Sequence, residues 1–241
     1  MTFPPHTFPP LLSLETVSRG AVLVVAPHPD DEVIGCGGAI ALHRQRGDPV
    51  HIALVTRGEA GGLDEERLAE SQLAGSGLGD VSVTCLDGTD GAVGGDRAWQ
   101  DRLARVVEAV SPVVVYAPSP FEMHPDHIAT LDGTAEVLQG NEGIELLLYE
   151  VNTESMASFL LDITSVADSK RAALQAFASQ IGQIDIVEKA DARARARTVN
   201  IDLPEVTHAE AFLRLSPERV AEALSRLKDL ATFLGLDPEG T

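Results

Sequence analysis

The chain has 241 residues, of which 44% are hydrophobic, so it is long enough for one packed α/β domain and too apolar for a disordered protein. Its 37 acidic residues outnumber 18 basic ones, and the net charge of −19 argues against nucleic acid or an anionic membrane as partner. No secretory leader and no apolar run of the ~20 residues that a membrane span needs is expected, and two distant cysteines without metal-binding spacing suit a cytoplasmic protein.

A proline-rich arm at residues 1–20 precedes a regular succession of predicted elements. Apolar segments predict strands at 21–26, 50–55, 81–86, 112–117 and 144–149, and helical patterns lie between them at about 35–47, 64–78, 97–110 and 127–139. This alternation is typical of βαβ units. It predicts an α/β fold with a Rossmann-like, doubly wound and mostly parallel sheet of strand order 3-2-1-4-5.

The alternation stops at residue 150. A helical pattern at about 165–181, a mixed region to residue 215 and a final helix follow, with Ser216 as the expected N-cap. The Ala/Arg run at 192–197 predicts a solvated helix face. We therefore expect a single domain, in which a core at 21–150 is completed by a helical or mixed extension at 151–241 that closes the substrate pocket.

Acidic side chains crowd the turn after the first predicted strand. Residues 26–34 read Ala-Pro-His-Pro-Asp-Asp-Glu-Val-Ile, which places His28 close to the adjacent Asp30 and Asp31. Adjacent carboxylates repel each other unless a cation neutralises them, so a metal site is the first hypothesis. The glycines of 35–38 superficially suggest a nucleotide-binding loop, but they follow the acidic turn and do not form G-x-G-x-x-G.

A second cluster, Phe-Glu-Met-His-Pro-Asp-His at 121–127, follows the fourth predicted strand. In the expected strand order the first and fourth strands are neighbours, and the switch point between them is where such sheets bind ligands. The two clusters should therefore face each other across one crevice. Two histidines and one carboxylate with open positions form a common catalytic zinc or ferrous set, although the four candidates His28, Asp31, His124 and His127 need not all be ligands.

Together the clusters resemble the signature of the PIG-L (LmbE-like) N-deacetylases, a strand followed by A-x-H-P-D-D-E and, later, an H-P-D-H element. Weaker similarities cover most of the chain: Thr56–Gly61, Arg67 with Glu70 and Leu78-Gly79, Asp90-Gly91, Lys170 with Ser179-Gln180, and Ala209–Phe212.

The resemblance implies a role for each residue of the two clusters. A divalent metal, zinc or else ferrous iron or another divalent ion, would be held by His28, Asp31 and His127. Asp30 would be the general base, and protonated His124 would be the electrophile and acid, oriented by Asp126. Substrate contacts are expected from Arg57, Glu59, Arg67, Asp90 and His208, and a surface pairing of little energetic weight is the alternative for Arg67.

The implied activity is removal of an acetyl group from an N-acetylated amino sugar or a glycoconjugate of one, a small-molecule substrate, by an enzyme that is compatible with a homo-oligomer. One alternative is an amidase of the same family that cleaves a larger acyl group or a thiol-conjugate amide. Others are a nucleotide-binding or methyl-donor-binding protein and a non-catalytic metal-binding scaffold. The zinc-hydrolase interpretation is preferred because acid, base and ligand candidates are all present.

Overall fold

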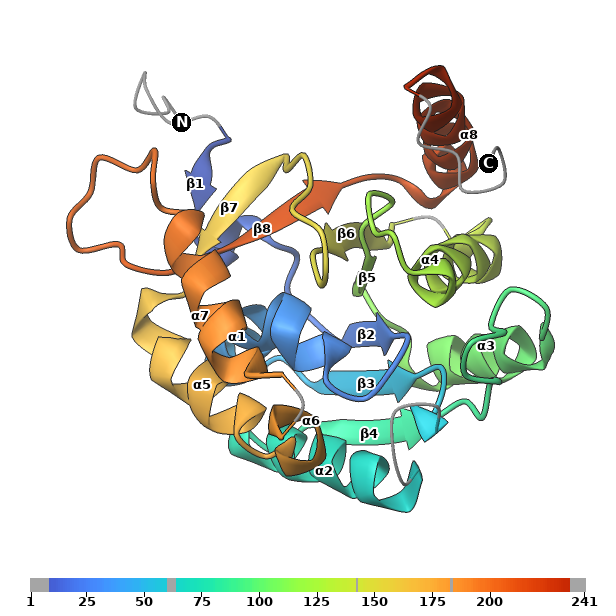
Figure 1. Cartoon of the computed structure of the whole chain (residues 1–241), viewed down its shortest axis with the longest axis horizontal. Coiled ribbons are helices and arrows are strands. Elements are labelled where there is room, and N and C mark those ends of the chain that lie inside the picture. The colour runs from blue at the N-terminus through green and yellow to red at the C-terminus, as the bar shows by residue number, and fades with distance from the viewer. Residues whose placement is uncertain (1–8, 60–63, 142, 183, 235–241) are drawn as a thin grey trace.

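The structure is a computed structural model that describes residues 9–59, 64–141, 143–182 and 184–234 (Figure 1). These residues form an α/β fold around a mixed eight-stranded sheet of order β1-β7-β8-β6-β5-β2-β3-β4. The strands are β1 Leu11–Leu12, β2 Val22–Ala26, β3 Val50–Leu54, β4 Ser82–Cys85, β5 Val114–Pro118, β6 Glu145–Tyr149, β7 Phe159–Asp162 and β8 Ala209–Arg214. The α-helices are α1 Asp31–Arg46, α2 Asp64–Gly77, α3 Ala98–Val110, α4 Pro125–Leu138, α5 Ala167–Leu174, α6 Ala178–Ile181, α7 Ile186–Ala196 and α8 Pro217–Phe233.

The five strands β4-β3-β2-β5-β6 are parallel to one another, and β2 lies between β3 and β5. Every residue of β2 is buried, as expected for a central strand covered on both faces. Successive side chains of β2 enter different cores. Val24 packs with residues of α1, α2 and α5, whereas Leu23 packs with residues of α3, α4 and α8. The sheet therefore has a helical layer and a hydrophobic core on each face.

Three strands lie outside the predicted core and are not indicated by the sequence pattern: β7 and β8 after residue 150, and β1 in the N-terminal arm. Antiparallel β8 pairs with both β6 and β7, and the two-residue strand β1 pairs with β7. In place of the single helix expected at 165–181, the structure has three short elements: a 3-10 turn, then α5, then α6. Phe177 lies between α5 and α6, and its ring is buried. Helix α7 occupies part of the region expected to be mixed. No helix in the described part of the chain is long and apolar enough to cross a membrane.

Helix α1 is broken at Cys36, whose φ of −141° and ψ of 25° are not helical. A buried ion pair fills the break. Lys170 Nζ donates to the Ile34 carbonyl at 2.9 Å and lies 2.8 Å from Glu210 Oε1, while the Glu210 carboxylate accepts both N–H groups of Gly38–Ala39 at 2.7 and 2.8 Å. A cation thus meets the end of the first helical segment and an anion meets the start of the second, in keeping with the helix dipole. This pair holds the first turn of α1 in place.

Candidate metal centre

The turn from β2 into α1 holds Asp30 at a φ of 107°, a conformation that residues with side chains rarely adopt. Two buried side chains hold this backbone. Glu32 Oε2 accepts the Asp30 N–H at 3.0 Å, and Arg67 Nη2 donates to the Pro29 carbonyl at 2.8 Å. Strained backbone persists only where its surroundings over-determine it. The directions of the Asp30 and Asp31 side chains are therefore set by their surroundings.

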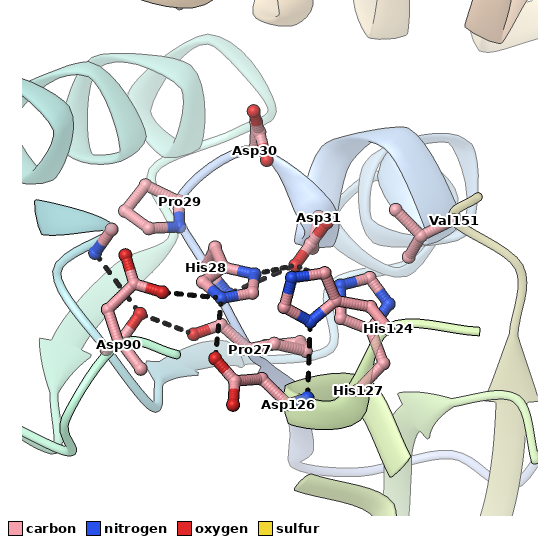
Figure 2. Close-up of polar contacts among 12 residues, drawn as sticks. Pro27, His28, Pro29, Asp30, Asp31, Asp90, His124, Asp126, His127 and Val151 are labelled. Carbon is pink, nitrogen blue, oxygen red and sulfur yellow. Dashed lines mark hydrogen bonds and ion pairs between the residues drawn. The ribbon is translucent and has the colours of Figure 1, made fainter. Parts of the chain in front are cut away.

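His28, Asp31 and His127 converge on one point (Figure 2). Asp31 Oδ2 lies 3.2 Å from His28 Nδ1 and 3.3 Å from His127 Nε2. His28 follows β2 and His127 lies in the first turn of α4, after β5, so the contact joins the ends of neighbouring strands. The two clusters found in the sequence thus meet at the carboxyl edge of the parallel sheet.

The second nitrogen of each of these imidazoles contacts another carboxylate. His28 Nε2 lies 3.2 Å from Asp126 Oδ2 and 3.1 Å from Asp90 Oδ1, and His127 Nδ1 lies 3.1 Å from Glu122 Oε2. Metal-binding histidines commonly donate their other ring N–H to a carboxylate, which fixes the tautomer and the ring orientation. Both rings therefore leave one nitrogen directed at the point of convergence.

The cluster is strongly anionic and needs positive charge. Burial alone would lower the pKa of His28, but the carboxylates of Asp126 and Asp31 outweigh it and raise that pKa to about 10. Burial likewise opposes a raised pKa at His127, yet Asp31 and Glu122 raise it to about 9. Burial would raise the pKa of Asp31, but the two imidazoles hold it well below its usual range. Two imidazolium ions or one bound cation can supply this charge.

Two groups of three residues could each hold a metal ion, because within each group the potential ligand atoms all lie within 4.8 Å of one another. The first group is His28, Asp31 and His127, and the second is His28, His124 and Asp126. The first group fits a metal better. Both oxygens of Asp126 in the second group accept backbone N–H groups, from Gly91 at 2.7 Å and Val93 at 3.1 Å. In the first group only Asp31 Oδ2 does so, from His28 at 3.0 Å. Two nitrogens and one carboxylate oxygen suit zinc or ferrous iron.

Asp30 stands apart from the converging side chains (Figure 2). Burial raises the pKa of its carboxyl well above the usual range, and the Asp31 charge adds to this, while Arg67, 3.6 Å away, opposes it. A carboxyl whose pKa is raised in this way holds a proton more readily than an exposed aspartate, as a group that accepts and returns a proton must.

His124 is the N-cap of α4, and its Nδ1 accepts the Asp126 N–H at 3.2 Å. The proton of the neutral ring is therefore on Nε2. Burial and the nearby His127 and His28 lower the pKa of His124, which favours a neutral N–H donor over the protonated ring expected from the resemblance. The Asp126 carboxylate contacts the ring of His28, while the hydrogen bond between Asp126 and His124 is made by the Asp126 backbone N–H.

The residues expected to contact substrate have other contacts in the structure. Arg57 pairs with Asp87 at 2.8 Å, and Glu59 accepts the Asp90 N–H at 3.1 Å. Arg67 is buried and braces the turn after β2 rather than pairing at the surface, and Asp90 contacts His28. His208 lies directly before β8, where it is buried with its Nε2 3.2 Å from Asp191, and it is not among the residues that line the cleft beside Asp30 and Asp31.

A cleft of about 230 Å³ opens beside Asp30 and Asp31. Its far wall comes from the extension and includes Gln180 of α6 together with Lys189 and Arg193 of α7. From the sequence, Gln180 was named only among the family similarities, and neither Lys189 nor Arg193 was assigned to the site. The only available signal was their helical spacing, which also fits a solvated face.

Residues 23–138 match the family model PIG-L, described as GlcNAc-PI de-N-acetylase. A 4-oxalmesaconate hydratase of Pseudomonas putida is 30% identical over 199 residues, which cover 70% of this chain and 76% of the hydratase. A diacetylchitobiose deacetylase of Thermococcus kodakarensis is 33% identical over 118 residues, less than half of either chain at 44% each. The solved N,N'-diacetylchitobiose deacetylase of Pyrococcus horikoshii superimposes with a TM-score of 0.71 at 25% identity, covering 83% of this chain and 85% of that one.

Proposed function

The chain belongs to the PIG-L family, and we propose that it is a metal-dependent hydrolase that removes the acetyl group from an N-acetylated amino sugar or a glycoconjugate of one. The convergence of His28, Asp31 and His127 beside the separate carboxyl of Asp30 carries this proposal. It is supported by relatives named as deacetylases of diacetylchitobiose and of an acetamido-glucopyranosyl inositol. Water and the amide would give acetate and a free amine.

A bound divalent metal would polarise the amide carbonyl and make water acidic enough to lose a proton near pH 7. Asp30 accepts that proton and, because its raised pKa lets it remain protonated, returns it to the leaving nitrogen. The Nε2–H of His124 donates to the oxygen on which negative charge develops. Asp126 and Glu122 hold the rings of His28 and His127 in the orientation that the metal requires.

We also propose the identity of the metal, the type of core fold and the domain organisation. Zinc is the proposed metal, with ferrous iron as the alternative, because the ligand set suits both. The description of the core as Rossmann-like and doubly wound is supported by its parallel strand order and its two helical layers. A single domain with a pocket-closing extension is supported by the place of α7 in the cleft wall. The cytoplasmic location and the oligomeric state stay predictions, as does the amidase alternative.

The hydratase relative makes water addition to a carbon–carbon double bond the second candidate activity, because the match covers 76% of that enzyme. The same metal, base and donor could serve either reaction. A panel of N-acetylated sugars, N-acylated sugars with larger acyl groups and unsaturated dicarboxylates separates them. Amine and acetate release that stops with a chelator and returns with zinc supports deacetylation. Hydration without any amine release would assign the chain to the second activity and overturn the first.

A further inference from the structure

The arginines of α7 and its C-terminal end differ in their partners. Arg195 pairs with Asp191 at 2.7 Å, and Arg197 pairs with buried Glu150. Arg193 forms no ion pair within the described chain, and its Nη1 is buried without a hydrogen-bond partner. A buried donor left unsatisfied is costly, so native proteins usually give such a group a partner. Arg193 also lines the cleft beside Asp30 and Asp31, so it brings to that cleft a positive charge that no described carboxylate pairs with.

Lys189 lies one helical turn before Arg193, on the same face of α7, and also lines the cleft. It too makes no ion pair with the residues that the structure describes. The neighbouring wall offers the neutral amides of Gln180 and Asn152. Two cations thus face the cleft from one side in a chain whose net charge is −19. Asp30 and Asp31 line the same cleft and contribute no positive charge to it, so Lys189 and Arg193 are the two cationic side chains among the described residues that line it.

We infer that Lys189 and Arg193 form an anion-binding subsite, so that the amino-sugar substrate carries a carboxylate or phosphate on its attached group. The inference deepens the proposed function and rests on it. An arginine fork matches two oxygens of either group, and a lysine adds a point charge. With its anionic group at the cations of α7, such a substrate would place its amide toward Asp30 at the other part of the same cleft.

The test compares two probes of nearly equal shape, carboxymethyl N-acetylglucosaminide and its neutral carbamoylmethyl analogue. Calorimetry on the zinc-loaded Asp30→Asn protein measures binding without turnover. We expect the carboxylate to bind at least about 10-fold more tightly than the amide, and Arg193→Gln in the same background to remove most of that preference. Lys189→Gln should reduce it. Arg195→Gln, which removes the same charge from the solvent side of α7, is the matched control and should leave it unchanged.

N-acetylglucosamine 1-phosphate, compared with the methyl glycoside, shows whether phosphate or carboxylate is the better ligand. Equal affinity for the charged and neutral probes, no binding of either anion, or an equal loss in the Arg195 control would overturn the subsite. Turnover by the wild-type chain is read separately. Preferential anion binding without acetate release would leave the subsite standing and count against the proposed function. Acetate release with the same KM for both probes would support the proposed function and count against the anion-binding subsite.

Discussion

His28 and His127 present ring nitrogens to the same oxygen of Asp31, and their ring centroids lie 5.5 Å apart. The rings come from turns that follow different strands, and each is held from behind by a carboxylate. Free imidazoles and carboxylates do not gather in this way without compensating charge. The arrangement is therefore prepared for a cation.

Replacing Asp30 by Asn should lower kcat by a factor of about 10² to 10⁴, the usual contribution of a general base, while the protein keeps its metal. The reason is that Asp30 stands apart from the three converging ligands. Metal analysis and acetate release measure the two effects. His127→Ala is the contrasting variant and should lose both metal and activity. Normal turnover in the Asp30 variant, or stoichiometric zinc in the His127 variant, would refute the assigned roles.

Replacing Asp126 by Asn distinguishes two roles for this carboxylate. Because it contacts His28 Nε2, its loss should weaken zinc binding by about 10- to 100-fold, as is typical for partners of metal-binding histidines. Competition with a chromophoric chelator measures the zinc affinity. If Asp126 instead served to orient His124, the affinity for zinc would stay unchanged and only kcat would fall.

Removal of the metal should make the stability of the protein depend on pH. In the metal-free state the folded pKa values of His28 and His127, about 10 and about 9, lie above the value of 6.5 for an unperturbed histidine. Their contribution to stability is thus fully present below about pH 6.5 and is lost as the pH rises through about 9 to 10. The Tm of chelator-treated protein should therefore fall over this range.

The zinc-loaded protein is the control for that experiment, because its ligands are already deprotonated and metal binding is favoured as protons are released. Saturating metal at 1,000 times its Kd should add about 4 kcal/mol to the stability. A chelator-treated protein whose Tm is the same at pH 6.5 and pH 9.5 would contradict the assigned charge balance.

Replacing Lys170 by Met should leave Glu210 as an unpaired buried charge in the break of α1. Breaking a buried ion pair from one side costs about 3–5 kcal/mol, which corresponds to a Tm lower by roughly 10 °C for a domain of this size. Thermal unfolding measures this loss. Glu222→Gln, which breaks the exposed pair with Arg226 on α8, is the control and should shift Tm by about 2 °C or less. Equal shifts in both variants would show that the break needs no charged support.

The parallel core was predictable because its strands are continuous apolar runs separated by helices of ordinary length. The extension was not. Strand β1 has two residues, and β8 carries Glu210 at a position that faces the break in α1 instead of an apolar core. The Ala/Arg run of α7 looks like a solvated face, and only the tertiary structure separates Arg193, which lines the cleft, from the ion-paired Arg195.

The convergence of His28, Asp31 and His127 was predictable for a related reason. Adjacent acids and a histidine at a strand end indicate a cation without knowledge of the rest of the chain. The partners of those residues lie far away in the sequence, and nothing local signals them. The contact of Asp126 with His28 and the support of His127 by Glu122 depend on how two loops pack, so both required the structure.

The position of the metal tests the central claim most directly. Anomalous diffraction from crystals of the zinc-loaded protein should place one ion about 2.0–2.2 Å from His28 Nδ1, His127 Nε2 and an Asp31 oxygen. An ion bound through His28 Nε2 together with His124 and Asp126, or located away from both histidine clusters, would contradict it.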